Sequence, residues 1–188
     1  KYDLFESCEV GKRVRAYVLN ALGNNDALKR GTAAEGVVAD GGEGTMAAMS
    51  KALDGELCNV VVSDPLGRSV EAAYGYVESE GVAIVDTASA SGLTLLSSSE
   101  RNPLLTTSYG TGEIIAAAIR RGCRRIYLGL GGSATNDGGM GLLRALGYRF
   151  YDASGEELMG CGRDLSRVSR IDASQRMSGL TDVTFIVA

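Results

Sequence analysis

The hydrophobic and polar positions of this 188-residue chain follow two different periods. In residues 8–22 the apolar side chains recur at helical spacing, with Ser7 as a candidate N-cap and Gly23 just past the end, where helices favour glycine. A short apolar run at residues 35–40 predicts a buried strand, and residues 45–53 predict the helix that follows it. The pattern therefore predicts a strand–loop–helix unit near the start of the chain.

An antiparallel meander is predicted next. Residues 57–64, 68–79 and 82–86 are rich in apolar and aromatic side chains and are separated by short turn-like segments. The first two segments are joined by Asp64–Gly67, which has proline at its second position and glycine at its fourth, as a type I turn prefers. We expect these strands to pair in the order in which they occur.

The remainder of the chain again favours alternating strands and helices. A Ser-rich connection without periodicity runs over residues 87–103. Beyond it the pattern predicts helices at 111–121 and 139–146 and strands at 124–130, 148–152 and 184–188. The sum is an α/β fold with two α/β subdomains, in which parallel strand–loop–helix units are combined with an antiparallel meander. We expect residues 1–63 to form part of a Rossmann-like or flavodoxin-like α/β domain, and residues 64–188 to form a second α/β domain that is incomplete at its C-terminus.

Composition and charge exclude several classes of protein. The net charge of −4 and the pI of about 5.0 argue against non-specific nucleic-acid binding, which needs basic patches. No run of about 18 apolar residues is present, so no membrane span is expected, and the N-terminal KYDLFESCEV does not resemble a signal peptide. The four cysteines are widely spaced and form no CxxC pair, as is typical of free thiols in a reduced compartment. We therefore expect a cytoplasmic protein with neither nucleic acid nor a membrane as a partner.

The absence of histidine narrows the chemistry further. The chain contains none, which removes Ser-His-Asp and Cys-His catalysis within it and disfavours a zinc site. Any general base in this chain must therefore be a carboxylate, a lysine or a tyrosine.

Two glycine-rich segments, ADGGEGT at residues 39–45 and GLGGSATNDGG at residues 129–139, each lie between a predicted strand and a predicted helix. Helix N-termini attract anions, and glycine lets the backbone approach a phosphate closely. Each segment also carries acid: Asp40 and Glu43 in the first, and Asp137 in the second. Acids beside a phosphate are expected where a metal ion lies between them or where a proton must be removed, as in metal-assisted phosphoryl transfer. Neither segment contains lysine, so neither is a P-loop.

Two other functions remain open at this point. Gly129, Gly131 and Ala134 match the GxGxxA pattern of dinucleotide-binding loops, and Asp152 ends the next predicted strand, which together suggest an NAD-dependent oxidoreductase. This match is weakened by SATNDGG, which prolongs the loop and delays the helix. The third hypothesis is a non-catalytic module that only binds an acidic ligand.

Several longer motifs carry a resemblance to a known family. VADGGEGT, DPLGRSVEAAYG, ASASGL, RNPLLTTSYGTGEII and GLGGSATNDGGMG follow one another between residues 38 and 141. In this order and spacing, the chain resembles the type I glycerate kinases from about Glu9 to Ala188. The resemblance implies ATP-dependent phosphorylation of D-glycerate, assisted by Mg²⁺, in a cleft between two α/β domains. It also implies a small molecule, glycerate, as the partner, with a homodimer as a compatible assembly.

The resemblance is interrupted at both ends. The family begins with a strand and a DSFKGS-like loop that contains a lysine, whereas this chain begins with KYDLFES, in which Glu6 lies near the position of that lysine. Beyond TFIVA the family continues into a CDV-like sequence and a further long segment. We therefore expect this chain to correspond to about the first half of a glycerate kinase, and not to be an active kinase alone.

The candidate site residues are concentrated in the loops. We expect Asp137 and Asp40 to be catalytic carboxylates, and Glu43 and Asp137 to contact a metal ion, with a helix cap as the alternative for each acid. Arg101 is expected to pair with the substrate carboxylate, with a solvated surface arginine as the alternative. Substrate or phosphate contacts are expected from Gly41, Gly42, Glu43, Gly44, Thr45, Ser89, Ser91, Arg101, Tyr109, Gly110, Thr111, Gly131, Gly132, Ser133, Thr135 and Asn136. For the hydroxyl and amide side chains of the second loop, the alternative is that they satisfy the backbone of the loop itself.

Overall fold

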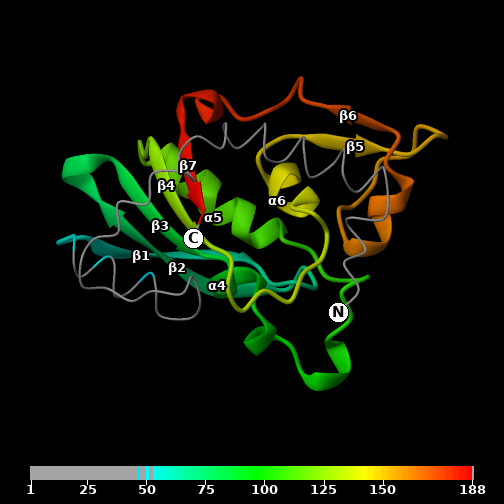
Figure 1. The fold of residues 1–188 in the computed structure, drawn as a ribbon, viewed down its shortest axis with the longest axis horizontal. Helices are drawn as coiled ribbons and strands as arrows, with labels where there is room; N and C mark the ends of the chain where they lie inside the picture. Colours follow the sequence, from blue (N-terminus) through cyan, green and yellow to red (C-terminus); the bar gives the residue numbers. More distant parts are fainter. Residues whose placement is uncertain (1–45, 47–49, 51–52, 188) are drawn as a thin grey trace.

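The computed structural model of the chain describes residues 46, 50 and 53–187. The helix expected at 8–22, the strand expected at 35–40 and the first glycine-rich loop lie outside the described residues. Those that are described form a five-stranded sheet, helices packed against it, and a separate two-stranded sheet (Figure 1).

The main sheet has the strand order β1-β2-β3-β4-β7. β1 (Glu56–Ser63), β2 (Ser69–Val77) and β3 (Val82–Asp86) pair antiparallel, which confirms the predicted meander. β4 (Arg125–Gly129) pairs in parallel with β3, and β7 (Thr184–Val187) pairs in parallel with β4. The sheet is therefore mixed, as the sequence predicts.

The turn between β1 and β2 forms as its sequence predicts. The N–H of Gly67 donates to the carbonyl oxygen of Asp64 at 3.0 Å, which closes the turn. Gly67 has a φ of +83°, a conformation that disfavours a side chain. The Asp64 carboxylate also accepts hydrogen bonds from the N–H groups of Leu66 and Arg68. This hairpin crosses the predicted boundary between residues 63 and 64, and the division of the chain into two domains stays a prediction.

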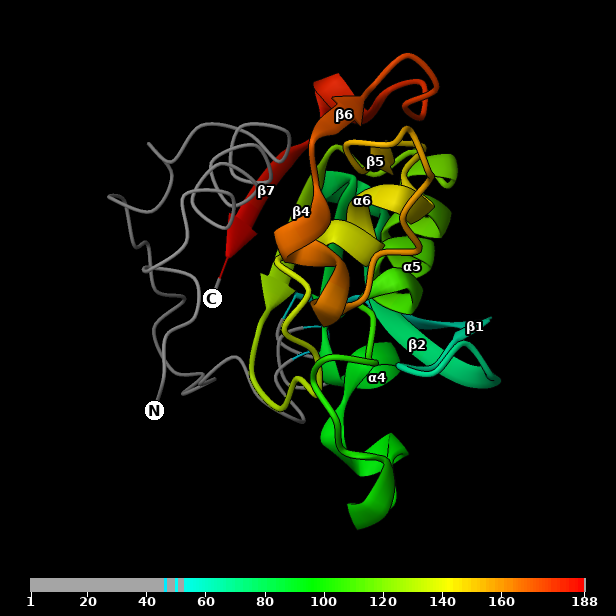
Figure 2. The same cartoon turned by 90° about the vertical axis from the view of Figure 1, so that its right-hand side faces the viewer.

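The described α-helices are α4 (Ala88–Ser91), α5 (Tyr109–Arg120) and α6 (Met140–Ala145). α5 and α6 lie side by side on one face of the sheet (Figure 2), and they confirm the two helices predicted from the hydrophobic pattern. α4 lies in the Ser-rich connection, where its four residues are too few to show a helical period. Shorter 3-10 helices occur at Glu78–Glu80, Leu93–Leu95, Ser98–Glu100, Gly162–Arg167 and Leu180–Asp182. No helix in the described part of the chain is long and apolar enough to span a bilayer.

The small sheet consists of β5 (Arg149–Tyr151) and β6 (Arg170–Asp172), which pair antiparallel. β5 confirms the strand predicted at 148–152, but it pairs with β6 and not with the main sheet. β6 was not predicted from the sequence.

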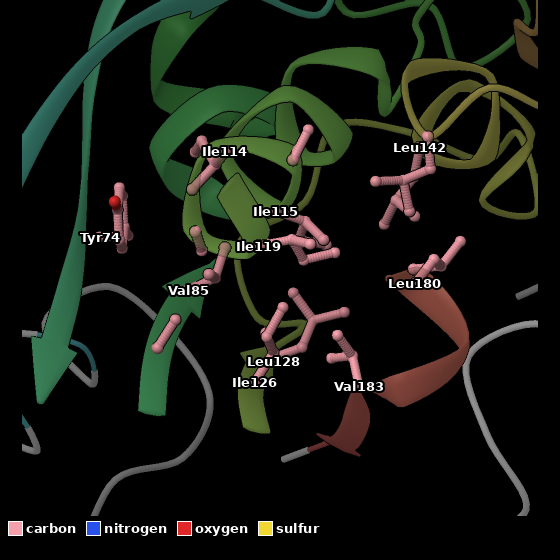
Figure 3. Close-up of a cluster of buried hydrophobic side chains, with 14 of the residues drawn as sticks. Tyr74, Val85, Ile114, Ile115, Ile119, Ile126, Leu128, Leu142, Leu180 and Val183 are labelled. Carbon is pink, nitrogen blue, oxygen red and sulfur yellow. The ribbon is translucent and has the colours of Figure 1, made fainter. Parts of the chain in front are cut away.

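α5 supplies the centre of the hydrophobic core. Ile114 and Ile115 are fully buried in one cluster with Leu128 of β4, and Ile115 lies next to Leu128 in the close-up (Figure 3). Burying a large aliphatic side chain contributes about 1.5–3 kcal/mol. α5 also approaches α6 closely, because a Cβ at Gly112 would overlap the carbonyl oxygen of Leu142. Core packing therefore fixes the starts of α5 and α6 relative to each other and to the sheet.

Candidate active site

The carboxyl ends of several strands meet at one edge of the main sheet. β1 and β3 run in the same direction because each pairs antiparallel with β2, and β4 is parallel to β3. Their last residues are Ser63, Asp86 and Gly129. The glycine-rich loop 129–139 leaves β4 at this edge, and α4 follows β3 at the same edge (Figure 1). Open α/β sheets bind ligands at such an edge, so we place the candidate site here.

The loop 129–139 is fixed against the chain that follows α4. The N–H of Leu93 donates to the carbonyl oxygen of Gly132 at 2.9 Å, and the N–H of Ala134 donates to that of Ser91 at 2.8 Å. Gly132 makes this path possible because its φ is +71°. Candidates from two separate sequence motifs are thereby brought together.

Several of the hydroxyl candidates are engaged within the protein. The hydroxyl oxygens of Ser91 and Thr111 are 2.8 Å apart and buried. Those of Ser133 and Thr135 are 2.9 Å apart, and the N–H of Thr135 also donates to the Ser133 hydroxyl. Asn136 is exposed in the same loop. These contacts support the alternative in which the hydroxyls hold the shape of the loop, and ligand binding by them stays a prediction.

Asp137 lies near the end of the loop, and only 2% of it is exposed. Its carboxylate accepts hydrogen bonds from the N–H of Ser108 at 2.7 Å and from the Ser108 hydroxyl at 2.8 Å. It also accepts the N–H groups of Gly139 at 3.0 Å and Gly141 at 3.1 Å. Burial raises the pKa of Asp137, and these hydrogen bonds oppose the shift in part.

The backbone N–H groups at the start of α6 all donate hydrogen bonds to acceptors within the chain. The N–H of Met140 donates to the backbone carbonyl of Asp137, and the N–H of Leu142 donates to the Ser108 hydroxyl, each at 3.0 Å. With the two glycines already described, consecutive N–H groups of the first turn all have protein acceptors. The anion at this helix terminus is thus Asp137 itself. The arrangement supports the helix-cap alternative, while the catalytic and metal-binding roles of Asp137 stay predictions.

A second buried carboxylate, which sequence analysis did not select, lies at the end of β3. Asp86 is 3% exposed, and its Oδ2 accepts the N–H of Met46 at 3.0 Å. Among the described residues, its Oδ1 is buried and has no hydrogen-bond partner, and the same is true of the hydroxyl of the adjacent Thr87. Burial raises the pKa of Asp86, and the Met46 N–H opposes this shift. The signal in the sequence is an acid at the end of an apolar strand, in VAIVD.

Asp86 also links Met46 to the start of the second glycine-rich loop. The candidates of the first loop, Asp40, Gly41, Gly42, Glu43, Gly44 and Thr45, lie outside the described residues. Met46 directly follows that loop, and its hydrogen bond to Asp86 brings it to the carboxyl end of β3. The second loop begins at Gly129, which is the partner of Asp86 in the parallel ladder.

The other candidates surround this edge. Arg101 is exposed, and its guanidinium donates to the carbonyl oxygen of Leu93 at 3.3 Å, close to the docked glycine-rich loop. Ser89 on α4 and Gly131 in the loop are half-buried. Whether these groups contact a ligand stays a prediction.

Tyr109 and Gly110 form the first residues of α5. A Cβ at Gly110 would overlap the carbonyl oxygen of Ser63, the last residue of β1. Packing of the helix on the strand end therefore explains the glycine without a ligand. Tyr109 is half-buried beside it.

The described residues do not fit a magnesium site by themselves. Within residues 46, 50 and 53–187, no group of three or more His, Cys, Asp or Glu side chains could hold a metal ion. The oxygens of Asp137 accept N–H and O–H donors, which a cation would have to displace. We therefore derive no chemical step through Mg²⁺.

The structure removes the geometric basis of the NAD hypothesis. The dinucleotide fingerprint requires an acid at the end of a strand that neighbours the glycine-rich loop in one sheet. Asp152 follows β5, which belongs to the separate two-stranded sheet. Its carboxylate accepts hydrogen bonds from Ser154 and forms an ion pair with Arg167 at 2.8 Å. The interactions of the Asp152 carboxylate are thus explained by these local partners, and no bound ribose is needed.

The mixed α/β sheet with glycine-rich loops at its carboxyl edge defines the class of protein, and comparison with known proteins identifies the family. A model of the glycerate kinase family matches residues 2–188. The glycerate kinase of Bacillus subtilis (strain 168) is 46% identical over 151 residues, which are 80% of this chain and 40% of that protein. The glycerate 2-kinase of Escherichia coli (strain K12) is 44% identical over 151 residues, again 80% of this chain and 40% of the relative. A crystal structure assigned as glycerate kinase 2 from Salmonella typhimurium LT2 has a TM-score of 0.76 at 44% identity, and the match covers 79% of this chain and 40% of that one.

The chain therefore belongs to the glycerate kinase family. This confirms the resemblance and the α/β fold class expected from the sequence. The chain spans about 40% of the length of the relatives to which it is compared.

Proposed function

We propose that the full-length protein containing these residues is a glycerate kinase, which transfers a phosphoryl group from ATP to a hydroxyl of D-glycerate. The observation that carries this proposal is the family match over residues 2–188. A requirement for Mg²⁺, an interdomain cleft and a cytoplasmic location belong to the proposal as the resemblance implies them. The product is 2- or 3-phosphoglycerate, according to which hydroxyl reacts.

The carboxyl edge of the sheet supports a phosphoryl-transfer site. The second glycine-rich loop begins there, and the residue after the first loop reaches the same edge through Asp86. Phosphoryl transfer depends mainly on holding donor and acceptor in line and on stabilising charge. The second glycine-rich loop, which backbone hydrogen bonds fix at this edge, is suited to that positioning.

Among the described carboxylates, Asp86 is the one best suited to accept the proton of the glycerate hydroxyl. The chain contains no histidine. Oδ1 of Asp86 has no hydrogen-bond partner within the part of the chain that the structure describes. Its raised pKa lies closer to that of an effective general base than the pKa of an exposed aspartate. In this proposal Asp137 holds the starts of α5 and α6 in place, and Asp40 remains the second candidate base.

The direct test measures ADP production with ATP, Mg²⁺ and D-glycerate, using the full-length protein and residues 1–188 in parallel. We expect turnover by the full-length protein and a loss of more than about tenfold for residues 1–188, because positioning of both reactants contributes about 7–11 kcal/mol in such reactions. Reactions without glycerate give the background ATPase rate.

Two outcomes would contradict the proposal. If glycerate does not raise ADP release by the full-length protein above the background rate, a ligand-binding module becomes the better interpretation. Turnover by residues 1–188 within about tenfold of the full-length rate would show that both walls of the active site lie in this chain. Omission of Mg²⁺ with excess EDTA tests the ion requirement in the same assay.

A further inference from the structure

A cavity of about 400 Å³ opens beside the start of α5. Its walls come from the β1–β2 turn, from Thr107 and Tyr109 at the start of α5, from Arg144 of α6, and from residues 159–163. Pockets that bind small molecules have volumes of about 300–1,000 Å³. The cavity is therefore large enough for a small organic acid or a phosphate group.

The charged side chains that line the cavity are all cationic. Arg144 and Arg163 contribute to its wall, and none of the described residues that line it is an aspartate or glutamate. Arginine presents several N–H donors in a planar fork that matches the oxygens of a carboxylate or phosphate. The lining therefore favours an oxyanion over a neutral or cationic ligand.

Arg144 is held in place by two of its five N–H donors. One terminal nitrogen donates to the carbonyl oxygen of Met159 at 2.7 Å, and the other lies 3.3 Å from the Glu157 carboxylate. That carboxylate is shared with Arg149, at 3.4 Å. The Nε of Arg144 is buried and has no hydrogen-bond partner in the described part of the chain, although a buried N–H is normally paired. The side chain is 13% exposed, so this donor is fixed and largely screened from water.

Apolar side chains complete the wall and remain partly exposed. Leu66, Leu105 and Met159 line the cavity with 37%, 46% and 68% of their surface exposed. A few polar groups set in a mainly apolar lining are typical of ligand pockets.

The cavity also connects to the loops at the carboxyl edge of the sheet. The Thr107 hydroxyl oxygen lies 2.7 Å from the carbonyl oxygen of Gly160 and 3.4 Å from Oδ2 of Asp137. One side chain thus links the cavity wall to the carboxylate that caps α6. A ligand in the cavity would lie next to the segment that fixes the second glycine-rich loop.

We propose that this cavity is a binding site for a small oxyanion, with Arg144 and Arg163 as its ligand-binding cations. The inference deepens the proposed function, because it assigns the acid group of the acceptor to this wall, and it rests on that function for the identity of the acid. The same chemistry fits the carboxylate of glycerate and a free phosphate.

The test is isothermal titration calorimetry of the full-length protein with D-glycerate, with inorganic phosphate and with glycerol as the uncharged control. Arg163→Gln is the principal variant because Arg163 is exposed and its loss leaves the core intact. Arg144→Gln is the second variant, and Arg176→Gln, an exposed arginine outside the cavity, is the matched control. Thermal unfolding of each variant reports on its fold.

We expect Arg163→Gln and Arg144→Gln to weaken binding of at least one of the two anions by about tenfold or more, and Arg176→Gln to change it less than about twofold. Loss of glycerate binding alone assigns the cavity to the carboxylate, and loss of phosphate binding alone assigns it to a phosphate group. Unchanged binding of both anions in the two cavity variants overturns the inference.

The result is separable from that of the kinase assay. If the full-length protein phosphorylates glycerate and both cavity variants keep the wild-type KM for glycerate and for ATP, the cavity inference is wrong and the proposed function stands. If the protein does not phosphorylate glycerate but Arg163→Gln loses anion binding, the cavity is confirmed and the proposed function is wrong.

Discussion

The end of β3 and the loop after β4 each place one buried aspartate at the same edge of the sheet, but the two carboxylates have different surroundings. Asp137 accepts hydrogen bonds from the backbone and hydroxyl of Ser108 and from two amides of the first turn of α6. From the described residues, Asp86 accepts one hydrogen bond, from the N–H of Met46, and its second oxygen has no partner among them. Burial raises the pKa of both groups.

The difference shows that burial alone does not identify a reactive carboxylate. A buried carboxylate whose two oxygens both accept hydrogen bonds has a structural role, because removing the carboxylate leaves several N–H groups unsatisfied. A carboxylate with a vacant oxygen can still accept a proton or a hydrogen bond from a ligand. On this argument Asp137 organises the helix starts, and Asp86 is available for chemistry.

The largest expected effect is that of Asp137→Asn. The amide nitrogen would face N–H donors, so we expect the free energy of unfolding to fall by about 2–4 kcal/mol. Urea denaturation of the wild type and the variant measures this loss.

Activity separates the two roles of Asp137. If it is also catalytic, as the sequence suggests, kcat of the folded variant falls by about 10²–10⁴. If it is only a cap, kcat of the fraction that remains folded stays within about threefold of the wild type. Unchanged stability together with unchanged kcat would contradict both roles.

Sequence patterns predict the elements around the two aspartates that depend only on a short segment of the chain. The meander, the Asp64–Gly67 turn, α5 and α6 each follow from periodicity or turn chemistry within a short segment. The glycine-rich loop after β4 was also predicted, together with the presence of a carboxylate in it. Its family resemblance is confirmed by the match over residues 2–188.

The partners of the two aspartates could not be predicted, because they are distant in sequence. Ser108 precedes Asp137 by 29 residues, and Met46 precedes Asp86 by 40. The packing of helices and strands decides which of the two carboxylates has hydrogen-bond donors on both oxygens. No local sequence pattern encodes that packing. The separation of β5 from the main sheet is likewise a tertiary feature, and it removes Asp152 from the site.

A smaller loss of stability is expected from Gly132→Ala. This variant tests whether the loop after β4, which ends at the Asp137 cap, is held in a single conformation. Gly132 has a φ of +71°, and an added Cβ would lie 3.1 Å from the Cβ of Ala88. The left-handed conformation costs about 1–2 kcal/mol for a residue with a side chain, so stability should fall by about that amount.

Gly67→Ala is the matched control for this variant. Gly67 has a φ of +83°, and an added Cβ would meet nothing within 4 Å. Equal losses of stability in the two variants would show that strain alone is responsible. If the loop also binds a ligand, only Gly132→Ala should lower turnover, and equal turnover in the two variants would count against that role.

The smallest effect on stability is expected from Asp86→Asn. Only one hydrogen bond to the carboxylate is at risk, and removal of a buried charge with a vacant oxygen offsets its loss. At neutral pH we expect a change of less than about 1 kcal/mol in the free energy of unfolding, with a loss of kcat of about 10²–10⁴ if Asp86 is the general base. A large loss of stability with kcat unchanged would reverse the comparison with Asp137.

The pH dependence of stability sharpens this last prediction. The pKa of Asp86 is raised in the folded protein, whereas an unfolded aspartate has a pKa of about 3.9. Between these two values the folded state binds more protons than the unfolded state, so this carboxyl group contributes stability at low pH that is lost as the pH rises through the folded value. The Asp86→Asn variant lacks this pH-dependent contribution. When its free energy of unfolding is subtracted from that of the wild type, the contributions of the other titratable groups cancel. The difference should therefore favour the wild type most near pH 4 and decline towards neutral pH, as urea denaturation at several pH values would measure. A difference that stays constant, or that grows with pH, would mean that the second oxygen of Asp86 has a partner in solution that stabilises its charge.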